Sequence, residues 1–184
     1  MTEAEIIQKL LAARDLKSKK AIDKFFHPVH PADIKSPFDP KPAIKLIKSH
    51  IKKGNKIAIY GDYDVDGICS TAILWETLYA GYKNVFPHIP HRREEGYGLS
   101  LAGIDHCLAQ GAKLIITVDN GIVAHEQIKY CRNKDCDIIT IDHHEVGDSL
   151  PPANATLHST STCAAGLTWF FCRDFLKEIG RAHV

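Results

Sequence analysis

The sequence predicts an α/β fold in which a parallel β-sheet carries helices on both faces. From about residue 43 onward, short strand-like runs alternate with longer segments of helical periodicity. The strand-like runs are rich in isoleucine and valine and apolar at consecutive positions, as is typical of parallel strands that are covered on both sides. These runs are KIAIY (56–60), NVFPHI (84–89), KLIITV (113–118) and DIITI (137–141).

The segments between and around these runs are predicted to be helices. Gly54 is expected to end the first of them, because glycine is common just after the last helical turn. The helical segments are AIKLIKSHIKKGN (43–55), GICSTAILWETLYAG (67–81), LSLAGIDHCLAQG (99–111), VAHEQIKYCRNKD (123–135) and, after the last strand, GLTWFFCRDFLKEIG (166–180).

The residues that precede the α/β region predict a different organisation. A short charged helix comes first, and the stretch 25–42 then holds five prolines, which favour an extended, irregular segment. We therefore expect an N-terminal helical and proline-rich segment over residues 1–48, followed by an α/β domain over residues 49–177.

The composition is that of one globular domain with a short appended segment. The chain has 184 residues and a formal net charge of +1, and so small a net charge neither indicates nor excludes a nucleic-acid partner. Because no apolar run reaches the length of a membrane span and no secretory signal is evident, we expect a cytoplasmic protein without a membrane partner. The six cysteines form no CxxC pair, so buried free thiols are expected rather than zinc ligands or disulfides.

Acidic residues and histidines follow three of the four predicted strands. KIAIY runs into GDYDVDG, KLIITV runs into DNG, and DIITI runs into DHH. Because the carboxyl ends of parallel strands meet at one edge of a sheet, these side chains are expected to share one rim. The rim residues are Asp62, Asp64, Asp66, Asp119, Asp142, His143 and His144.

A cluster of this kind predicts a site for cations. Like charges placed together repel unless solvent or a cation neutralises them. Mixed carboxylate and imidazole ligands suit Mn²⁺ or Mg²⁺, and a shared carboxylate can bridge two ions. Each residue alone has an ordinary alternative, since an aspartate at a strand end often caps the next helix and a loop histidine is usually a surface residue.

The motifs on these strands resemble those of a known superfamily. GDYDVDG, TVDNGI and TIDHHEVG, in this order, resemble motifs I to III of the DHH phosphoesterases. The loop IPHRREEGYG (89–98) is similar to the IPxRxxEGYG loop of RecJ-type, single-strand-specific exonucleases. The resemblance covers roughly residues 25–160, and its motifs are specific only in combination.

The resemblance implies roles for the rim residues. Asp64 and Asp119 would hold one Mn²⁺ (or Mg²⁺), and a second ion would be held by the set Asp66, Asp119 and His143, with Asp119 as the bridge. His144 would contact the scissile phosphate or assist proton transfer, and Asp142 would orient the two histidines.

One position departs from the superfamily pattern. Many members have a histidine four residues before the ligand that matches Asp64, whereas this chain has Tyr60. The departure implies that Asp62 serves the first ion in place of that histidine.

The loop between the second strand and the next helix is expected to bind the substrate. His91, Arg92 and Arg93 would hold backbone phosphates, and Tyr97 would stack on a base. A solvated, charged loop is the alternative interpretation of the same residues.

The function implied is metal-assisted phosphodiester hydrolysis by a 5′-to-3′ exonuclease of single-stranded DNA in repair and recombination. Two alternatives belong to other classes. One is a DHH oligoribonuclease or cyclic-dinucleotide phosphodiesterase, and the other is a non-catalytic DHH scaffold that binds nucleic acid.

The superfamily has a fourth motif, an aspartate that completes the second ion's ligand set. No convincing candidate follows His158, because Asp174 falls within a predicted helix. We therefore expect an N-terminal fragment with little or no activity alone. Its last residues, EIGRAHV (178–184), resemble a translated sequencing-adapter read-through and are expected to be non-native.

Overall fold

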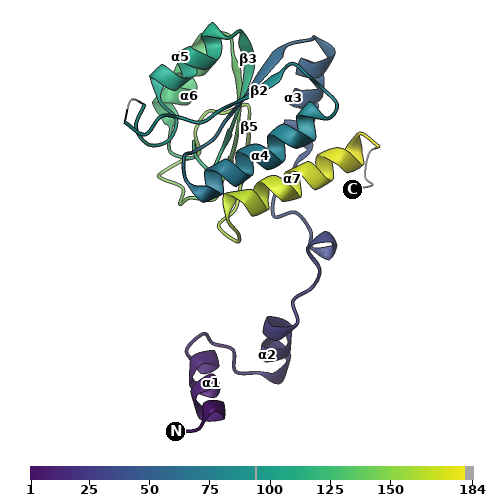
Figure 1. Ribbon diagram of the computed structural model, residues 1–184, viewed down its shortest axis with the longest axis vertical. Coiled ribbons are helices and arrows are strands. Elements are labelled where there is room, and N and C mark those ends of the chain that lie inside the picture. The colour runs from purple at the N-terminus through teal and green to yellow at the C-terminus, as the bar shows by residue number, and fades with distance from the viewer. Residues whose placement is uncertain (94, 181–184) are drawn as a thin grey trace. The chain divides into compact units, whose positions relative to one another are not determined.

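A computed structural model describes residues 1–93 and 95–180 of the chain (Figure 1). The chain divides into two compact units, Met1–Lys35 and a larger unit that begins at Ser36. Residues 181–184, which include most of the tail expected to be non-native, lie outside the described residues.

The smaller unit contains two short helices, α1 (Glu3–Ala12) and α2 (Lys19–Phe26). The first begins with a capping box, because the Thr2 side chain accepts from the Glu5 amide and the Glu5 carboxylate accepts from the Thr2 amide. A single 3₁₀ turn, Pro31–Asp33, interrupts an otherwise irregular proline-rich stretch. One helix was expected in this region, and the structure has two.

The larger unit is built on a parallel sheet, which confirms the predicted fold class. In the described residues the sheet has five strands in the order β2-β1-β3-β4-β5, and every pairing is parallel. The strands are β1 (Lys56–Tyr60), β2 (Val85–His88), β3 (Ala112–Val118), β4 (Asp137–Asp142) and β5 (Ala155–His158).

Two of these strands lie at the edges of the sheet. The β5 strand was not predicted, because its four residues include two polar side chains and no long apolar run. The β2 strand was expected to be covered on both faces, yet it is half exposed and contains Pro87. The edge position of β2 explains its exposure, because one side of the strand has no neighbouring strand. It also explains Pro87, because proline has no amide hydrogen to donate to a neighbouring strand.

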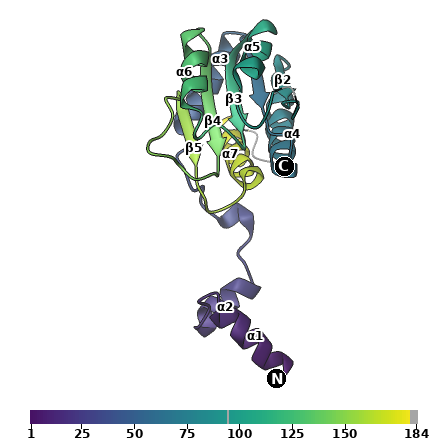
Figure 2. The ribbon, with the colours of Figure 1, turned by 90° about the vertical axis from the view of Figure 1, so that its left-hand side faces the viewer.

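Among the described residues five helices cover the sheet, three on one face and two on the other. Figures 1 and 2 show these helices on the two sides of the sheet. Helices α3 (Lys41–Lys52), α4 (Val65–Tyr79) and α7 (Ala164–Glu178) contribute to one buried cluster with the sheet. Helices α5 (Leu101–Ala109) and α6 (His125–Asn133) contribute to the other. The helices on both faces leave the carboxyl edge of the sheet as the place for polar side chains.

The α3 helix belongs to this larger unit. Ala43 and Ile47 are fully buried in the first cluster, and Phe38 packs against it. The unit therefore begins before α3, at Ser36. The boundary expected after residue 48 falls inside that helix.

The cysteines differ in part from the expectation of buried thiols. All six are free, but Cys69 and Cys163 are exposed and the other four are buried. Burial raises the pKa of the Cys107 thiol to about 12 and that of the Cys172 thiol to about 12. These buried thiols therefore stay protonated and act as small apolar side chains.

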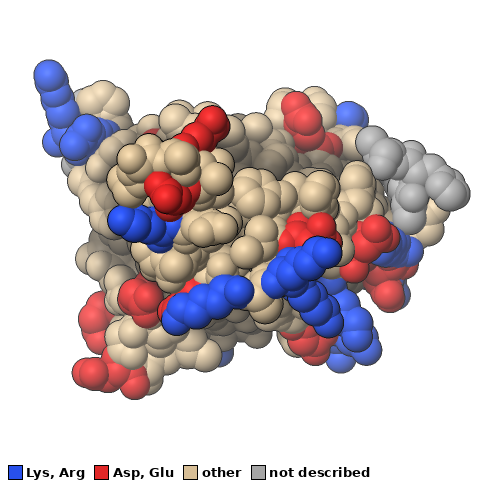
Figure 3. Space-filling view, turned by 90° about the horizontal axis from the view of Figure 1, so that it is seen from below, with Lys and Arg blue, Asp and Glu red and all other residues tan. Residues whose placement is uncertain are grey.

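The surface carries both signs of charge. On the face shown in Figure 3, lysines and arginines are interspersed with aspartates and glutamates. Among the described residues no helix is both long and apolar enough to cross a membrane.

Candidate metal centre

The predicted rim residues meet at the carboxyl edge of the sheet. Asp62 and Asp64 follow β1, Asp119 follows β3, and Asp142 is the last residue of β4. Ligand atoms from two sets of three residues lie within 4.8 Å of one another. The sets are Asp62 with Asp64 and Asp119, and Asp119 with His143 and His144. Asp119 is thus common to both sets, as a bridging carboxylate would be.

Asp62 is almost fully buried behind the start of α4. Its Oδ1 accepts a hydrogen bond from the Tyr63 amide at 2.7 Å, whereas its buried Oδ2 accepts none from the described residues. A methyl group at Gly67 would come within 2.6 Å of the Asp62 Cβ. The glycine after the three aspartates therefore lets α4 pass directly over Asp62.

Asp64 and Asp66 lie on either side of the first residue of α4. Asp64 is the N-cap of this helix, and its Oδ1 accepts from the Gly67 amide at 2.9 Å. The Asp66 carboxylate accepts from the first two amides of α7, those of Ala164 at 2.8 Å and Ala165 at 2.7 Å. Both side chains are held in place, and the remaining lone pairs of their oxygens are available to a cation.

Asp119 is the most perturbed acid of the rim. Its backbone has a φ of 63°, a left-handed conformation that aspartate and asparagine adopt more readily than most residues. Burial, together with the charges of Asp66 and Asp64, raises its pKa from 3.8 to about 8. Its Oδ1 is buried and accepts no hydrogen bond from the described residues. Burial and these charges therefore favour the protonated form of the metal-free side chain.

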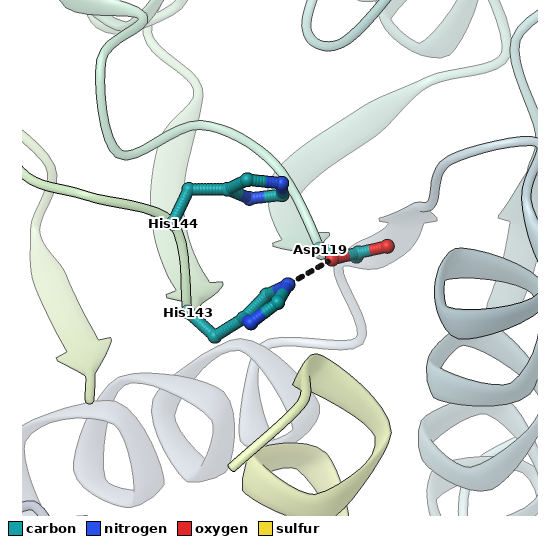
Figure 4. Close-up of side chains that lie close together, drawn as sticks. All are labelled: Asp119, His143 and His144. Carbon is teal, nitrogen blue, oxygen red and sulfur yellow. Dashed lines mark ion pairs between the residues drawn. The ribbon is translucent and has the colours of Figure 1, made fainter. Parts of the chain in front are cut away.

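His143 lies between Asp66 and Asp119. Its Nε2 is 3.3 Å from the Asp119 Oδ1 and 3.6 Å from the Asp66 Oδ2. In Figure 4 the imidazole of His143 and the carboxylate of Asp119 point toward each other from the ends of β4 and β3. The structure therefore brings together the three side chains expected to hold the second ion.

Asp142 fixes the backbone and the ring that follow it. Its Oδ1 accepts from the amides of His143 at 2.8 Å and His144 at 3.2 Å, and from the His144 Nδ1 at 2.7 Å. Its Oδ2 accepts from the Ile122 amide at 2.9 Å. Burial lowers the pKa of His144, but the hydrogen bond and charge of Asp142 outweigh it, so the net shift is upward. Asp142 thus has the orienting position that was expected of it.

Tyr60, which replaces a histidine of the superfamily pattern, has its hydroxyl engaged away from the acidic cluster. The hydroxyl donates to the Gly98 carbonyl at 3.3 Å, and its oxygen lies 3.4 Å from the Ser100 Oγ. Burial raises its pKa. Tyr60 therefore supports the loop that leads into α5, and Asp62 is the side chain that lies with Asp64 and Asp119.

One of the four named residues of the loop expected to bind substrate reaches a rim residue. The Tyr97 hydroxyl lies 3.2 Å from the His144 Nε2, and Tyr97 is 64% exposed. The Arg92 guanidinium lies 5.1 Å from the centre of the Tyr63 ring. His91 and Arg93 are exposed, and His91 engages the loop through its backbone amide, which donates to Glu95.

Several residues of the site were not anticipated from the sequence. The Glu95 carboxylate pairs with His88 at 2.9 Å and so ties the loop to the end of β2. The side chains of Tyr63 and Tyr97 meet edge to face, with ring centres 6.3 Å apart. His158, at the end of β5, donates to the His144 carbonyl at 2.7 Å. His158 is a polar residue at the end of a fourth strand, and that position could have identified it from the sequence. The strand itself, β5, was not recognised.

The chemistry of this cluster fits divalent cations. Two unit charges 4.8 Å apart repel by roughly 3.5 kcal/mol at an effective dielectric constant of about 20, and three carboxylates lie within that distance here. Two buried carboxylate oxygens, Asp62 Oδ2 and Asp119 Oδ1, accept no hydrogen bond from the described residues. Carboxylate oxygens and imidazole nitrogens without thiolates suit Mn²⁺ or Mg²⁺.

The parallel sheet and this rim define an α/β protein with an aspartate- and histidine-lined, metal-type site at the carboxyl ends of its strands. Residues 56–181 match the DHH family, N-terminal domain. The chain belongs to the DHH family.

Its curated relatives are single-stranded-DNA-specific exonucleases named RecJ. The chain is 31% identical to that of Salmonella typhimurium over 188 residues, which cover 95% of this chain and 32% of the relative. It is 37% identical to that of Bacillus subtilis over 156 residues, which cover 83% of this chain and 20% of the relative. The chain thus spans about a third or less of the length of these relatives.

Solved structures give the same result. A crystal structure of exonuclease RecJ bound to manganese matches with a TM-score of 0.71 and 31% identity, over 83% of this chain and 40% of the other. RecJ from Thermus thermophilus in complex with Mn²⁺ matches with a TM-score of 0.68 and 26% identity, over 92% of this chain and 24% of the other.

Proposed function

We propose that this chain is the metal-binding DHH region of a 5′-to-3′ exonuclease that hydrolyses single-stranded DNA in repair and recombination. The single observation that carries the proposal is the position of Asp119, which lies with Asp62 and Asp64 in one set of potential ligands and is joined through His143 to Asp66 on the other side. The relatives named RecJ, and the manganese in two of the matching structures, support the substrate class and the metal.

We infer that the site takes two Mn²⁺ or Mg²⁺ ions. Asp62, Asp64 and Asp119 would hold one ion, and Asp66, Asp119 and His143 would hold the other. Such ions, when bound, supply an activated water and stabilise negative charge on a phosphate. Burial removes the water that would otherwise stabilise the charges of Asp62 and Asp119, so these carboxylates need either a proton or a bound cation to neutralise them.

His144 would act on the phosphate rather than on a metal. Asp142 accepts the Nδ1 proton of this ring, so Nε2 faces outward and, when protonated, can donate to a phosphate oxygen. The exposed Tyr97 ring stands beside that nitrogen and offers a surface for a base. Arg92, Arg93 and His91 would contact the backbone of the strand.

The first test measures Mn²⁺ binding by calorimetry. Asp119→Asn keeps the shape of the side chain and tolerates the left-handed backbone, but it removes the shared carboxylate. We expect this variant to lose both ions. Asp105→Asn is the matched control, because that carboxylate is on α5 and contacts Tyr130 instead. Undiminished Mn²⁺ binding by Asp119→Asn would overturn the proposed site.

The second test addresses the substrate. The chain and its Asp64→Ala/Asp66→Ala double variant are incubated with 5′-labelled single-stranded DNA and Mn²⁺, beside duplex DNA and a length series of RNA. The chain by itself is expected to release little or no nucleotide, so release from single-stranded DNA by the unmodified chain but not by the double variant would support the proposed activity and overturn that expectation. Release confined to short RNA favours the oligoribonuclease class, and DNA binding that is the same with and without Mn²⁺ favours a scaffold.

A further inference from the structure

The backbone leaves a gap between β1 and β3 at the point where the acidic turns begin. The ladder between these strands ends at the pair Tyr60 and Thr117. Beyond it, the Gly61 amide bonds to the His88 carbonyl on the outer side, at 2.9 Å. The Asp119 amide bonds to the Ile141 carbonyl on the other outer side, at 3.0 Å. Each acidic turn is therefore tied to its outer neighbour.

One side chain closes this gap. Asn120 is 3% exposed, and its Nδ2 donates to the Gly61 carbonyl at 3.0 Å and the Val118 carbonyl at 3.0 Å. The Tyr60 carbonyl lies 3.4 Å from the same nitrogen. A single amide thus joins two carbonyls, that of Gly61 directly after β1 and that of Val118 at the end of β3. The next residues in the chain are Asp62 and Asp119.

Two acidic side chains also meet at this gap. The carboxylates of Asp62 and Asp119 belong to one set of ligand atoms within 4.8 Å. Both must be charged to receive a cation, and their mutual repulsion then acts to spread the strand ends apart. The amide donors oppose that spreading, since they hold the two turns through carbonyls next to the charged residues.

The oxygen of the Asn120 amide, unlike its nitrogen, makes no hydrogen bond with the part of the chain that the structure describes. This Oδ1 atom is buried and accepts no hydrogen bond from the described residues. A buried acceptor without a partner lowers stability, so the stability of the core does not by itself account for an amide at this position. The part of the side chain that makes contacts is the donor nitrogen.

We propose that Asn120 is a positioning residue of the metal centre, which holds Asp62 and Asp119 at the spacing needed to share a divalent cation. The inference rests on the proposed metal site and extends it to a residue that is not one of the proposed metal ligands. A purely structural role would lower stability alone, whereas a positioning role lowers metal affinity in protein that remains folded.

The test compares Mn²⁺ affinity with stability for matched variants. Asn120→Ala removes the donors, and Asn120→Leu removes them while keeping a similar shape and adding no charge. Asn154→Ala is the control, because its amide contacts Ile138 and Asp137 at the opposite edge of the sheet. Each variant is titrated with Mn²⁺ at a temperature where circular dichroism shows it folded, and its thermal midpoint is measured with and without Mn²⁺.

We expect both Asn120 variants to bind Mn²⁺ about 10- to 100-fold more weakly, the scale seen when residues that orient ligands are replaced. Their upward shift of the thermal midpoint by Mn²⁺ should shrink accordingly. Asn154→Ala should keep the affinity of the unmodified chain, even if its midpoint falls.

The outcomes separate this inference from the proposed function. If the unmodified chain binds no Mn²⁺, the metal site itself is wrong and the inference falls with it. If it binds Mn²⁺ and either folded Asn120 variant binds equally well, only the positioning role is overturned. Should Asn120→Ala not fold, Asn120→Leu carries the same comparison.

Discussion

At the scale of single residues, Asp119 combines more of the site's distinctive properties than any other rim residue. It is buried, it has a left-handed backbone, and it contributes to both ligand sets. Burial and the neighbouring carboxylates favour its protonated form, whereas a divalent cation favours its charged form. Protons and metal ions therefore compete for this side chain.

The raised pKa of Asp119 predicts how the stability of the metal-free protein depends on pH. The pKa of Asp119 is raised from 3.8 to about 8 in the fold. The folded chain therefore keeps a proton that the unfolded chain releases, and stability should fall as pH rises from about 4 to about 8. Urea unfolding in EDTA at several pH values measures the slope, which should be shallower for Asp119→Asn. Equal slopes in both proteins would contradict the assignment.

The paired histidines should respond differently to substitution. His143→Ala removes an imidazole 3.3 Å from Asp119, and it should weaken Mn²⁺ binding roughly 10- to 100-fold or more. His144→Ala should retain the metal, because that ring is held by Asp142 and faces Tyr97. Calorimetry on the two variants decides the point, and equal losses of affinity would refute separate roles.

At the scale of elements, the first turn of α4 and the start of α7 shape the rim. Asp64 caps α4, and Asp66 accepts from the first amides of α7. Gly67 lets α4 approach Asp62 within contact distance. The aspartates of this turn thus make structural contacts in addition to their proposed role as metal ligands, and the capping interpretation does not exclude the metal one.

Gly67→Ala tests the close approach of α4 to Asp62. Alanine normally stabilises a helix interior by about 1 kcal/mol relative to glycine. Here the added Cβ would lie 2.7 Å from the backbone nitrogen of Asp62, so we expect lower thermal stability and weaker Mn²⁺ binding. Gly147→Ala, where nothing lies within 4 Å of the added Cβ, should leave both measurements unchanged. A stabilised Gly67→Ala protein with normal Mn²⁺ affinity would rule out the steric argument.

At the scale of the whole molecule, the fold and the site belong to the unit that begins at Ser36. The residues of both buried clusters lie at Phe38 or later in the chain. Ser36 itself donates to Asp174 on α7, and Arg173 donates to the Ser36 Oγ at 3.0 Å. Asp174 is therefore part of a structural contact with the beginning of the unit and is not a rim residue.

Removing residues 1–35 tests whether this unit folds independently. We expect the shortened chain to unfold cooperatively with an unchanged thermal midpoint and to bind Mn²⁺ as the full chain does, because both cores and all rim ligands remain. Differential scanning calorimetry and Mn²⁺ titration provide the comparison. A broad, non-cooperative transition would show that residues 1–35 are required for the fold.

The sequence by itself determined the sheet class, strands β1 to β4 of the five in the described residues, and the residues of the rim. Those features depend on local patterns: consecutive apolar residues mark covered strands, and acids directly after them mark the carboxyl edge. KIAIY followed by GDYDVDG carries both signals within 12 residues. The edge strand β5, only four residues long and half polar, lacks them.

Only the tertiary structure decided which contacts hold the rim and its surroundings in place. Asp66 bonds to α7, Tyr60 holds the loop before α5, and Asn120 joins β1 to β3. These contacts join residues that are between 38 and 98 positions apart in the chain, so no local pattern encodes them. The pKa of Asp119 has the same origin, because burial and neighbouring charges arise only when separate strand ends are packed side by side.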